Sequence, residues 1–131
     1  MAPMTVNPGT PRTLLADLIA AEEAGALPAL LPFWGHRPQR DASIGPGCDE
    51  QAWSEARFEL VVAGNLAKFT GDADLRRSLS ATGSKVLAEA SPRDRIWGIG
   101  MSASHEHAAR PSRWRGLNLL GFALMNVRDQ L

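Results

Sequence analysis

The segment Lys85–Gly100, KVLAEASPRDRIWGIG, is the most informative stretch for the fold of this chain. Residues 85–90 predict a strand, in which Val86, Ala88 and Ala90 would lie opposite Leu87 and Glu89. Ser91-Pro92 ends this strand, because proline lacks the N–H group that a sheet ladder needs. Residues 95–101 are expected to form a second short extended piece.

The second half of this segment combines residue types that suit a ligand site. Trp97 stands between a charged turn and two glycines, Gly98 and Gly100, which would let a backbone approach a ligand closely. An indole can stack on a planar base, and Asp94 could hold a sugar hydroxyl or a water. The alternative is that Trp97 belongs to the core and Asp94 caps a turn, and the residue types by themselves favour this alternative.

Outside this segment the pattern is mainly helical. Apolar residues at helical spacing follow Thr10-Pro11 and predict a first helix over residues 11–24. Residues 28–34 form a short apolar run, which could be a buried strand or an extended segment. Further helices are expected over 49–69, 72–81 and 117–128, with loops over 35–47 and 102–115 and a flexible tail over 1–10. About four helices and two or three short strands over residues 11–131 make one mixed, mainly helical α+β domain.

The predicted helix over residues 49–69 carries two candidate ligand contacts. Its apolar side consists of Phe58, Val61, Val62, Leu66 and Phe69. Asn65 lies on the same side, and a buried amide needs a hydrogen-bond partner, here either the backbone or a ligand. Lys68, near the end of the helix, suits the helix dipole and could also meet a phosphate.

The start of the last predicted helix is a second candidate site. Asn118 lies at or near its first residue, where free backbone N–H groups favour anions, and Gly121 would let the helix pack closely. The alternative is an asparagine cap and a packing glycine. The buried side of this helix is expected to consist of Leu117, Leu120, Gly121, Leu124, Val127 and Leu131. In the preceding loop the best local phosphate site is the basic cluster of Arg110, Arg113 and Arg115.

The composition argues against several classes of protein. The 131 residues suit one domain, and 14 basic against 14 acidic residues argue against a general nucleic-acid binder. The one cysteine, Cys48, excludes a disulfide within the chain and favours a reducing compartment. No membrane span or signal peptide is visible, so a cytoplasmic protein is expected. His105 and His107 lack the further ligands that a metal site needs.

Taken together, these stretches resemble the NADAR family of N-glycosidases. The matching text is Phe33–His36 (FWGH), Phe58–Phe69 (FELVVAGNLAKF), Ala81–Gly83, Val86–Gly100 and Pro111–Leu131 (PSRWRGLNLLGFALMNVRDQL), in the family's order. The resemblance implies hydrolysis of N-glycosidic bonds in phosphoribosylated pyrimidine intermediates of riboflavin synthesis or in ADP-ribosylated bases, with no metal or other cofactor. It also implies a pocket lined or shaped by Asn65, Lys68, Glu89, Asp94, Trp97, Gly98, Gly100, Asn118 and Gly121. Arg115, from the basic cluster, is a further candidate substrate contact.

One part of the family's pattern is absent from this sequence. Fuller members carry a long segment after a Gly-x-x-Cys region, and the glutamate of its Thr-x-Glu-His motif is thought to serve the chemistry. Here Gly45–Cys48 runs directly into Asp49–Trp53. The remaining catalytic candidates are Asp94 and Glu89, unless Asp49, Glu50 or Glu55 takes that place. The alternative is a catalytically impaired relative that binds nucleotide or ADP-ribose, or a non-functional remnant. Apolar surface left by the deletion could lead to a homo-oligomer.

Overall fold

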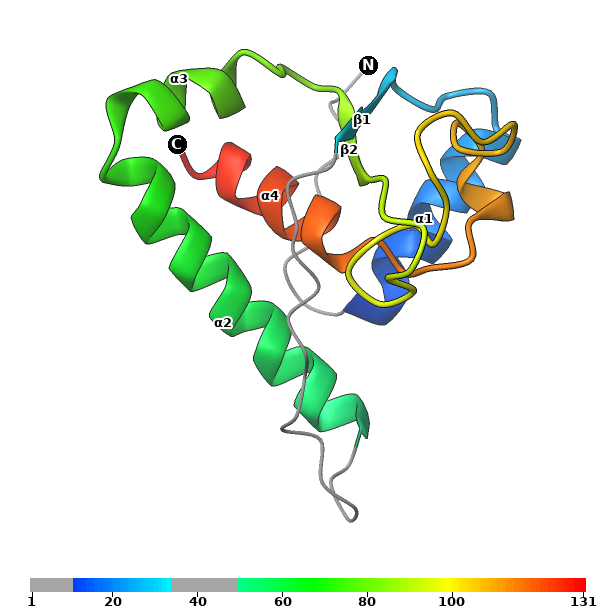
Figure 1. The fold of residues 1–131 in the computed structure, drawn as a ribbon, viewed down its shortest axis with the longest axis horizontal. Helices are drawn as coiled ribbons and strands as arrows, with labels where there is room; N and C mark the ends of the chain where they lie inside the picture. Colours follow the sequence, from blue (N-terminus) through cyan, green and yellow to red (C-terminus); the bar gives the residue numbers. More distant parts are fainter. Residues whose placement is uncertain (1–10, 34–49) are drawn as a thin grey trace.

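The computed structural model describes residues 11–33 and 50–131, with side chains described over 13–33 and 56–131. Figure 1 shows the helices α1 (Pro11–Glu23), α2 (Glu50–Thr70), α3 (Ala73–Ser80) and α4 (Leu119–Asp129), the strands β1 (Leu30–Phe33) and β2 (Val86–Glu89), and the 3-10 helix η1 (Pro111–Arg113). The expected mainly helical α+β fold is confirmed, with every predicted helix present. No helix in the described ranges is long and apolar enough to cross a bilayer.

Residues 95–101 differ from the expectation, because they form a series of bends and no strand. The backbone hydrogen bonds explain the difference. The carbonyl groups of Ile96, Trp97 and Gly98 accept from N–H groups at the start of α4 and not from a neighbouring strand. The expected loop over 102–115 also contains η1. The expected tail over 1–10 and loop over 35–47 lie outside the described residues.

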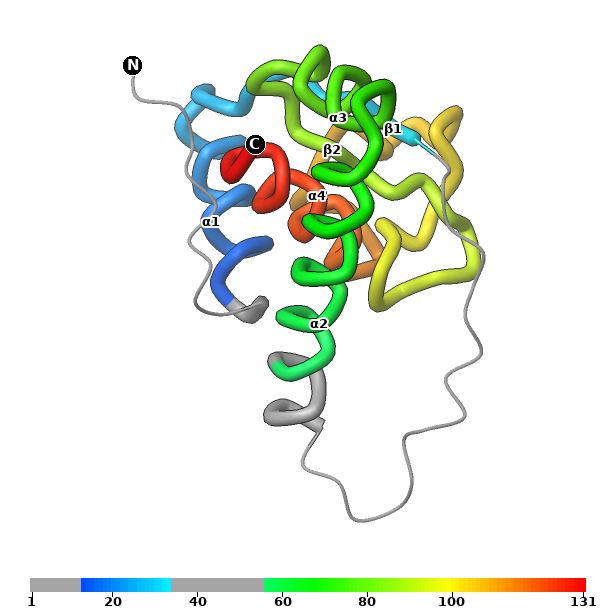
Figure 2. Tube along the Cα trace, turned by 90° about the vertical axis from the view of Figure 1, so that its left-hand side faces the viewer, coloured from blue at the N-terminus to red at the C-terminus, as the bar shows by residue number. Residues whose placement is uncertain are grey.

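Helix α4 is the centre of the described fold. It packs against β2 and against α2, and Figure 1 shows it between these two elements. Figure 2 shows the C-terminal half of α2 alongside α4, with α1 to one side. The buried residues of α4 are Leu119, Gly121, Phe122, Ala123, Met125, Asn126 and Val127. They surround the helix, as expected for a helix that neighbours cover on more than one side.

The expected buried side of α4 is therefore partly wrong. Leu117 precedes the helix and is 47% exposed. Leu120 and Leu124 are only half-buried, whereas Phe122 and Ala123, which the expected side left out, are fully buried. Because β2 and α2 cover different sides of α4, a single apolar stripe does not describe its packing.

The two strands pair in parallel, with Phe33 opposite Glu89. The N–H of Ala90 donates to the carbonyl oxygen of Phe33 at 2.7 Å. In a parallel pair, alternate residues direct their N–H and C=O groups to opposite edges of the strand. The backbone groups of Leu87 and Glu89 therefore point away from β1, toward the second edge of β2.

The side chain of Asn118 occupies this second edge. Its Nδ2 donates to the carbonyl oxygen of Leu87 at 3.0 Å, and its Oδ1 accepts from the N–H of Glu89 at 2.8 Å. The carboxamide thus takes the place of a peptide group in a third strand. Asn118 is fully buried and has a φ of 55°, a left-handed conformation that asparagine tolerates better than most residues. Gly121 completes the packing, because a methyl group there would overlap the carbonyl oxygen of Leu87.

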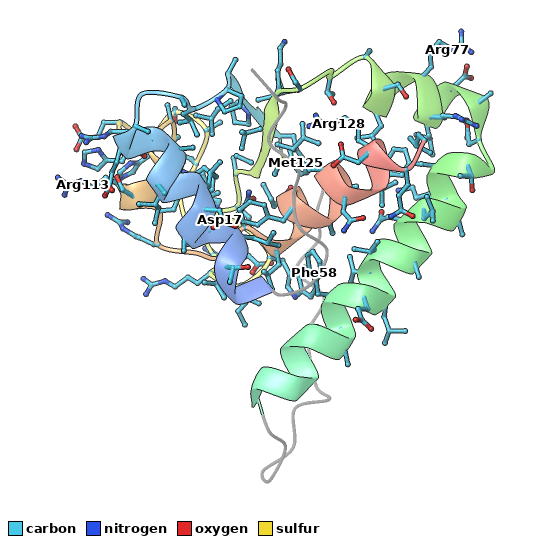
Figure 3. All side chains as sticks on the ribbon, turned by 180° about the vertical axis from the view of Figure 1, so that it is seen from behind. Asp17, Phe58, Arg77, Arg113, Met125 and Arg128 are labelled. Atoms are coloured by element: carbon cyan, nitrogen blue, oxygen red, sulfur yellow. The ribbon has the colours of Figure 1, made fainter. Side chains whose placement is uncertain are left out.

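Two side chains link elements that lie far apart in the sequence. Arg128, labelled in Figure 3, donates from Nη1 to Oγ1 of Thr82 at 2.9 Å and to the carbonyl oxygen of Lys85 at 2.8 Å. This link joins the end of α4 to the turn before β2. On α1, the carboxylate of Glu22 accepts from the N–H of Ser112 at 3.1 Å and from its hydroxyl at 2.6 Å. This second link holds α1 against η1.

We expect Asn118→Ala to lower the free energy of unfolding by about 3 kcal/mol, because each buried backbone group left without a partner costs about 1–3 kcal/mol. Denaturant unfolding followed by circular dichroism measures the change. Asn118→Gly is the matched control for the backbone, since glycine accepts the left-handed conformation but has no carboxamide; it should be destabilised as well. An Asn118→Ala protein that unfolds at the wild-type denaturant concentration would contradict this account of β2.

The link through Glu22 should depend on pH. The hydrogen bond from the Ser112 hydroxyl, supported by the Ser112 N–H and the charges of Arg110 and Arg113, holds the pKa of Glu22 below its ordinary value of 4.5, although burial acts in the opposite direction. A carboxylate whose pKa is lowered by folding stabilises the fold above the pKa of the unfolded chain. That contribution is lost as the pH falls through the pKa of the folded state.

We therefore expect Glu22→Gln to be less stable than the wild type at neutral pH, with a difference that shrinks as the pH falls below 4.5. Denaturant titrations at a series of pH values measure this difference. Ser112→Ala is the partner control: the two substitutions should combine non-additively, because they remove the same link. A difference of equal size at neutral and acid pH would show that the carboxylate charge contributes nothing.

Candidate functional site

Asp94 fixes the loop that carries Trp97. Its Oδ1 accepts from the N–H groups of Ile96 at 3.0 Å and Trp97 at 2.7 Å, so Asp94 does cap a turn. The carbonyl oxygen of Trp97 accepts from the N–H of Leu120 at 3.0 Å. The backbone of Trp97 is thereby attached both to its own turn and to α4, and the residue is 9% exposed. Both attachments set where the indole lies.

A pocket of about 500 Å³ opens beside this indole. It lies between α2, α4 and the end of β1. The described residues that line it are Phe33, Arg57, Val61, Gly64, Asn65, Lys68, Phe69, Trp97, Leu120 and Leu124. Three of the predicted substrate contacts, Asn65, Lys68 and Trp97, therefore meet at one pocket. The half-buried Leu120 and Leu124 of α4 form part of its apolar wall.

The described lining of this pocket is cationic. It contains Arg57 and Lys68 and no carboxylate. The guanidinium carbon of Arg57 lies 5.4 Å from the centroid of the Trp97 ring, and Nζ of Lys68 lies 5.7 Å from that of Phe69. Arg57 is not among the site residues predicted from the sequence. A signal was present, because Arg57 precedes Lys68 by eleven residues, about three helical turns, and so projects from the same side of α2.

Asn65 uses the backbone as one partner. It is half-buried, and its Nδ2 donates to the carbonyl oxygen of Val61, one turn earlier in α2, at 2.8 Å. This bond orients the carboxamide, and Oδ1 is the group with which Asn65 could accept a bond from a ligand hydroxyl. The sequence left open whether Asn65 bonds to the backbone or to a ligand. The backbone bond is present, and a ligand contact by Asn65 stays a prediction.

Glu89 and Asp94, the predicted catalytic carboxylates, are not among the described residues that line the pocket. Glu89 is fully buried at the end of β2, opposite Phe33. Its N–H donates to Asn118 and its carbonyl oxygen accepts from the N–H of Ile99 at 2.8 Å. Paired residues of a sheet direct their side chains to the same face, so Glu89 starts on the face where Phe33 borders the pocket. Its catalytic role, like that of Asp94, stays a prediction.

The expected anion site at the start of α4 is already occupied by the protein. The N–H groups of Asn118, Leu119 and Leu120 donate to the carbonyl oxygens of Gly98, Ile96 and Trp97, at 3.0, 3.2 and 3.0 Å. The loop thus satisfies donors that would otherwise attract an anion. The expectation of free N–H groups there is wrong. Asn118 stands at the cap position, but its side chain makes no capping hydrogen bond, because it is bound to β2.

Gly98, Gly100 and Arg115 shape the loop rather than the described lining of the pocket. A Cβ atom at Gly98 would lie 2.9 Å from the carbonyl oxygen of Asp94 and 3.0 Å from that of Glu89, so glycine favours this approach of the backbone. Gly100 has a φ of 75°, and a Cβ atom there would lie 2.9 Å from that of Arg115. The N–H of Arg115 donates to the carbonyl oxygen of Ile99 at 3.0 Å, and its side chain is exposed. Substrate contacts by these three residues stay predictions.

The polar loop over residues 102–115 makes contacts within the protein. Nε of Arg110 lies 3.9 Å from Oε2 of Glu22, which offsets part of the basic cluster. The N–H of His107 donates to Nδ1 of His105 at 3.0 Å. Across the described ranges, no group of three or more His, Cys, Asp or Glu side chains is placed to hold a metal ion.

Several predicted features lie outside the part of the chain whose side chains are described. These are Trp34–His36, the Gly45–Cys48 junction at which the family's longer segment would attach, and the substitute acids Asp49, Glu50 and Glu55.

Comparison with known proteins identifies a domain family and several relatives. The NADAR domain matches residues 33–131. An N-glycosidase of Acanthamoeba polyphaga mimivirus is 42% identical over 78 residues, 60% of this chain and 46% of the viral protein. An N-glycosidase of Nostoc punctiforme is 32% identical over 97 residues, 72% of this chain and 55% of that protein. The riboflavin biosynthesis protein PYRR of Arabidopsis thaliana is 30% identical over 100 residues, 71% of this chain and 15% of that protein. No solved structure matches the chain.

The chain spans about half the length of the two N-glycosidases. The matched range nevertheless includes every described residue that lines the pocket, from Phe33 to Leu124. The resemblance seen in the sequence is confirmed, and this chain belongs to the NADAR domain family.

Proposed function

We propose that this protein is an N-glycosidase that hydrolyses the bond between a base and a phosphoribosyl or ADP-ribosyl group. The observation that carries the proposal is the meeting of an indole and two cationic side chains, Trp97, Arg57 and Lys68, at a pocket of about 500 Å³. A pocket of this size accommodates a nucleotide-sized ligand. The relatives named N-glycosidases support the reaction type, and the relative named for riboflavin biosynthesis supports a phosphoribosylated pyrimidine as substrate.

The pocket would hold the two ends of such a substrate with different groups. The base would stack on Trp97 and would take the place of the Arg57 guanidinium, whose carbon lies 5.4 Å from the centroid of the indole. The phosphate would pair with Lys68, whose ammonium is a charged donor on the exposed side of α2. Residues 57 and 68 are eleven apart, or about 16 Å along the helix axis. This separation leaves room for a sugar between the two ends.

Hydrolysis also needs a carboxylate. Water adds to the anomeric carbon and loses a proton while the C–N bond breaks, and the electron pair of that bond goes to the base nitrogen, which takes up a proton. The transition state resembles an oxocarbenium ion, which a nearby carboxylate stabilises. Glu89 is our first candidate, because it extends from β2 on the face where Phe33 borders the pocket. Asp94 is the second, although its Oδ1 already positions Trp97.

The direct test is to incubate the purified chain with phosphoribosylated aminouracil intermediates and with ADP-ribosylated bases, and to follow the release of free base by chromatography. Release of base with first-order dependence on enzyme would support the proposal. Lys68→Met is the matched control for a contaminating glycosidase. It should raise KM while leaving the fold unchanged, whereas the KM of a contaminating enzyme would not change. No release from either substrate class by a protein with a cooperative unfolding transition would overturn the proposal.

Substitutions can distinguish the roles of Glu89 and Asp94. Glu89→Gln keeps the side-chain size but loses the charge, and we expect kcat to fall by about 10²–10⁴-fold. Asp94→Asn keeps an Oδ1 acceptor for the N–H groups of Ile96 and Trp97, so a positioning role predicts a much smaller loss than for Asp94→Ala. Equal losses in Asp94→Asn and Asp94→Ala would move the catalytic role to Asp94. A wild-type kcat in Glu89→Gln would exclude Glu89.

A second function is favoured by one observation, the lack of a carboxylate among the described residues that line the pocket. That lining suits a relative that binds nucleotide or ADP-ribose without hydrolysing it. Calorimetric titration with ADP-ribose, combined with the release assay, decides between the two functions. Saturable binding without release would establish the binding function, and release would exclude it.

A further inference from the structure

No contact among the described residues requires position 64 to be glycine. It lies in the middle of α2, where glycine destabilises a helix relative to alanine. Gly64 is exposed at the surface of α2, and a glycine inside a helix is usually explained by a positive φ or by a close neighbour. Gly64 has neither: its φ is not positive, and a Cβ atom there would meet nothing within 4 Å among the residues that the structure describes. Gly121 shows the contrast, because a methyl group there would overlap the carbonyl oxygen of Leu87.

The bare backbone at Gly64 faces the pocket described above. Gly64 is one of the residues that line it, together with Arg57 and Lys68 of the same helix. It follows Arg57 by seven residues and precedes Lys68 by four, so it lies between them along the same side of α2. A ligand with its ring at Trp97 and its phosphate at Lys68 must cross the helix surface at Gly64.

We propose that Gly64 determines which ligands the pocket accepts, because its lack of a side chain leaves the space in which the sugar of a nucleotide-like substrate crosses α2. This inference rests on the proposed function. A side chain at this position would project into the pocket between the base and the phosphate. Because the space is open and the backbone conformation is ordinary, the fold tolerates the side chain while the ligand does not. Stability and binding should therefore change in opposite directions.

The experiment uses a size series in the full chain. Gly64→Ala should raise the thermal midpoint, since alanine favours the helix, and should raise KM for the hydrolysed substrate. Gly64→Leu should raise KM by about tenfold or more, the usual effect of methylene-sized changes in a substrate pocket, with a smaller change in kcat. Ala67→Leu is the matched control, because Ala67 is exposed on the next turn of α2 and is not among the residues that line the pocket. Its KM should stay at the wild-type value.

The outcomes separate this inference from the function on which it rests. A wild-type enzyme that releases base, with Gly64→Leu keeping the wild-type KM, would overturn the role of Gly64 and leave the proposed function standing. An equal rise in KM for Gly64→Leu and Ala67→Leu would also overturn it, since a general effect on α2 would then be responsible. A wild-type chain that neither releases base nor binds ADP-ribose would overturn both. A graded rise in KM from Gly64→Ala to Gly64→Leu, with unchanged Ala67→Leu, supports the proposal.

Discussion

The carboxamide of Asn118 joins strand β2 to the start of helix α4 through two buried hydrogen bonds. A sheet of two strands has little stability by itself, and a buried strand edge must find partners for its backbone groups. Asn118 provides them for Leu87 and Glu89 from a position directly before α4. The place of the central helix is therefore set by hydrogen bonds to β2, in addition to apolar packing. Gly121 allows the short distance that these bonds need.

The position of the pocket follows from this constraint. The same turn before α4 receives the loop that carries Trp97, because the carbonyl groups of Ile96, Trp97 and Gly98 accept from the first N–H groups of the helix. Strand, loop and helix start thus form one hydrogen-bonded unit, and α2 packs against it from the other side of α4. The indole of Trp97 and the cationic side of α2 line the same pocket because both the Trp97 loop and α2 contact α4.

Much of this fold could be predicted from the sequence, since helices and strands depend on local spacing. The role of Asn118 could not, because an asparagine before a helix ordinarily indicates a cap, and its partners lie 29 and 31 residues away in the chain. The buried side of α4 was misjudged for a related reason, as the sequence does not tell how many neighbours cover a helix. Asn65 could be predicted as a pocket residue because it lies at helical spacing on the apolar side of α2, and Lys68 because it lies near the end of that helix. Gly98, Gly100 and Gly121 were noticed as glycines, but the atoms that require them come from distant segments.

The arrangement of charge suggests how a substrate would be oriented. Parallel strands end at the same edge, here at Phe33 and Glu89, and ligands of parallel sheets commonly bind beyond that edge. Phe33 borders the pocket there, while the cations Arg57 and Lys68 lie across from it on α2. A phosphorylated glycoside carries negative charge on its phosphate and develops positive charge at its anomeric carbon. The phosphate therefore needs cationic side chains and the anomeric carbon needs a carboxylate, and the two kinds of group serve best on different walls of the pocket. Cations on α2 and an acid at the sheet edge would draw the phosphate to the helix and turn the anomeric carbon toward β2.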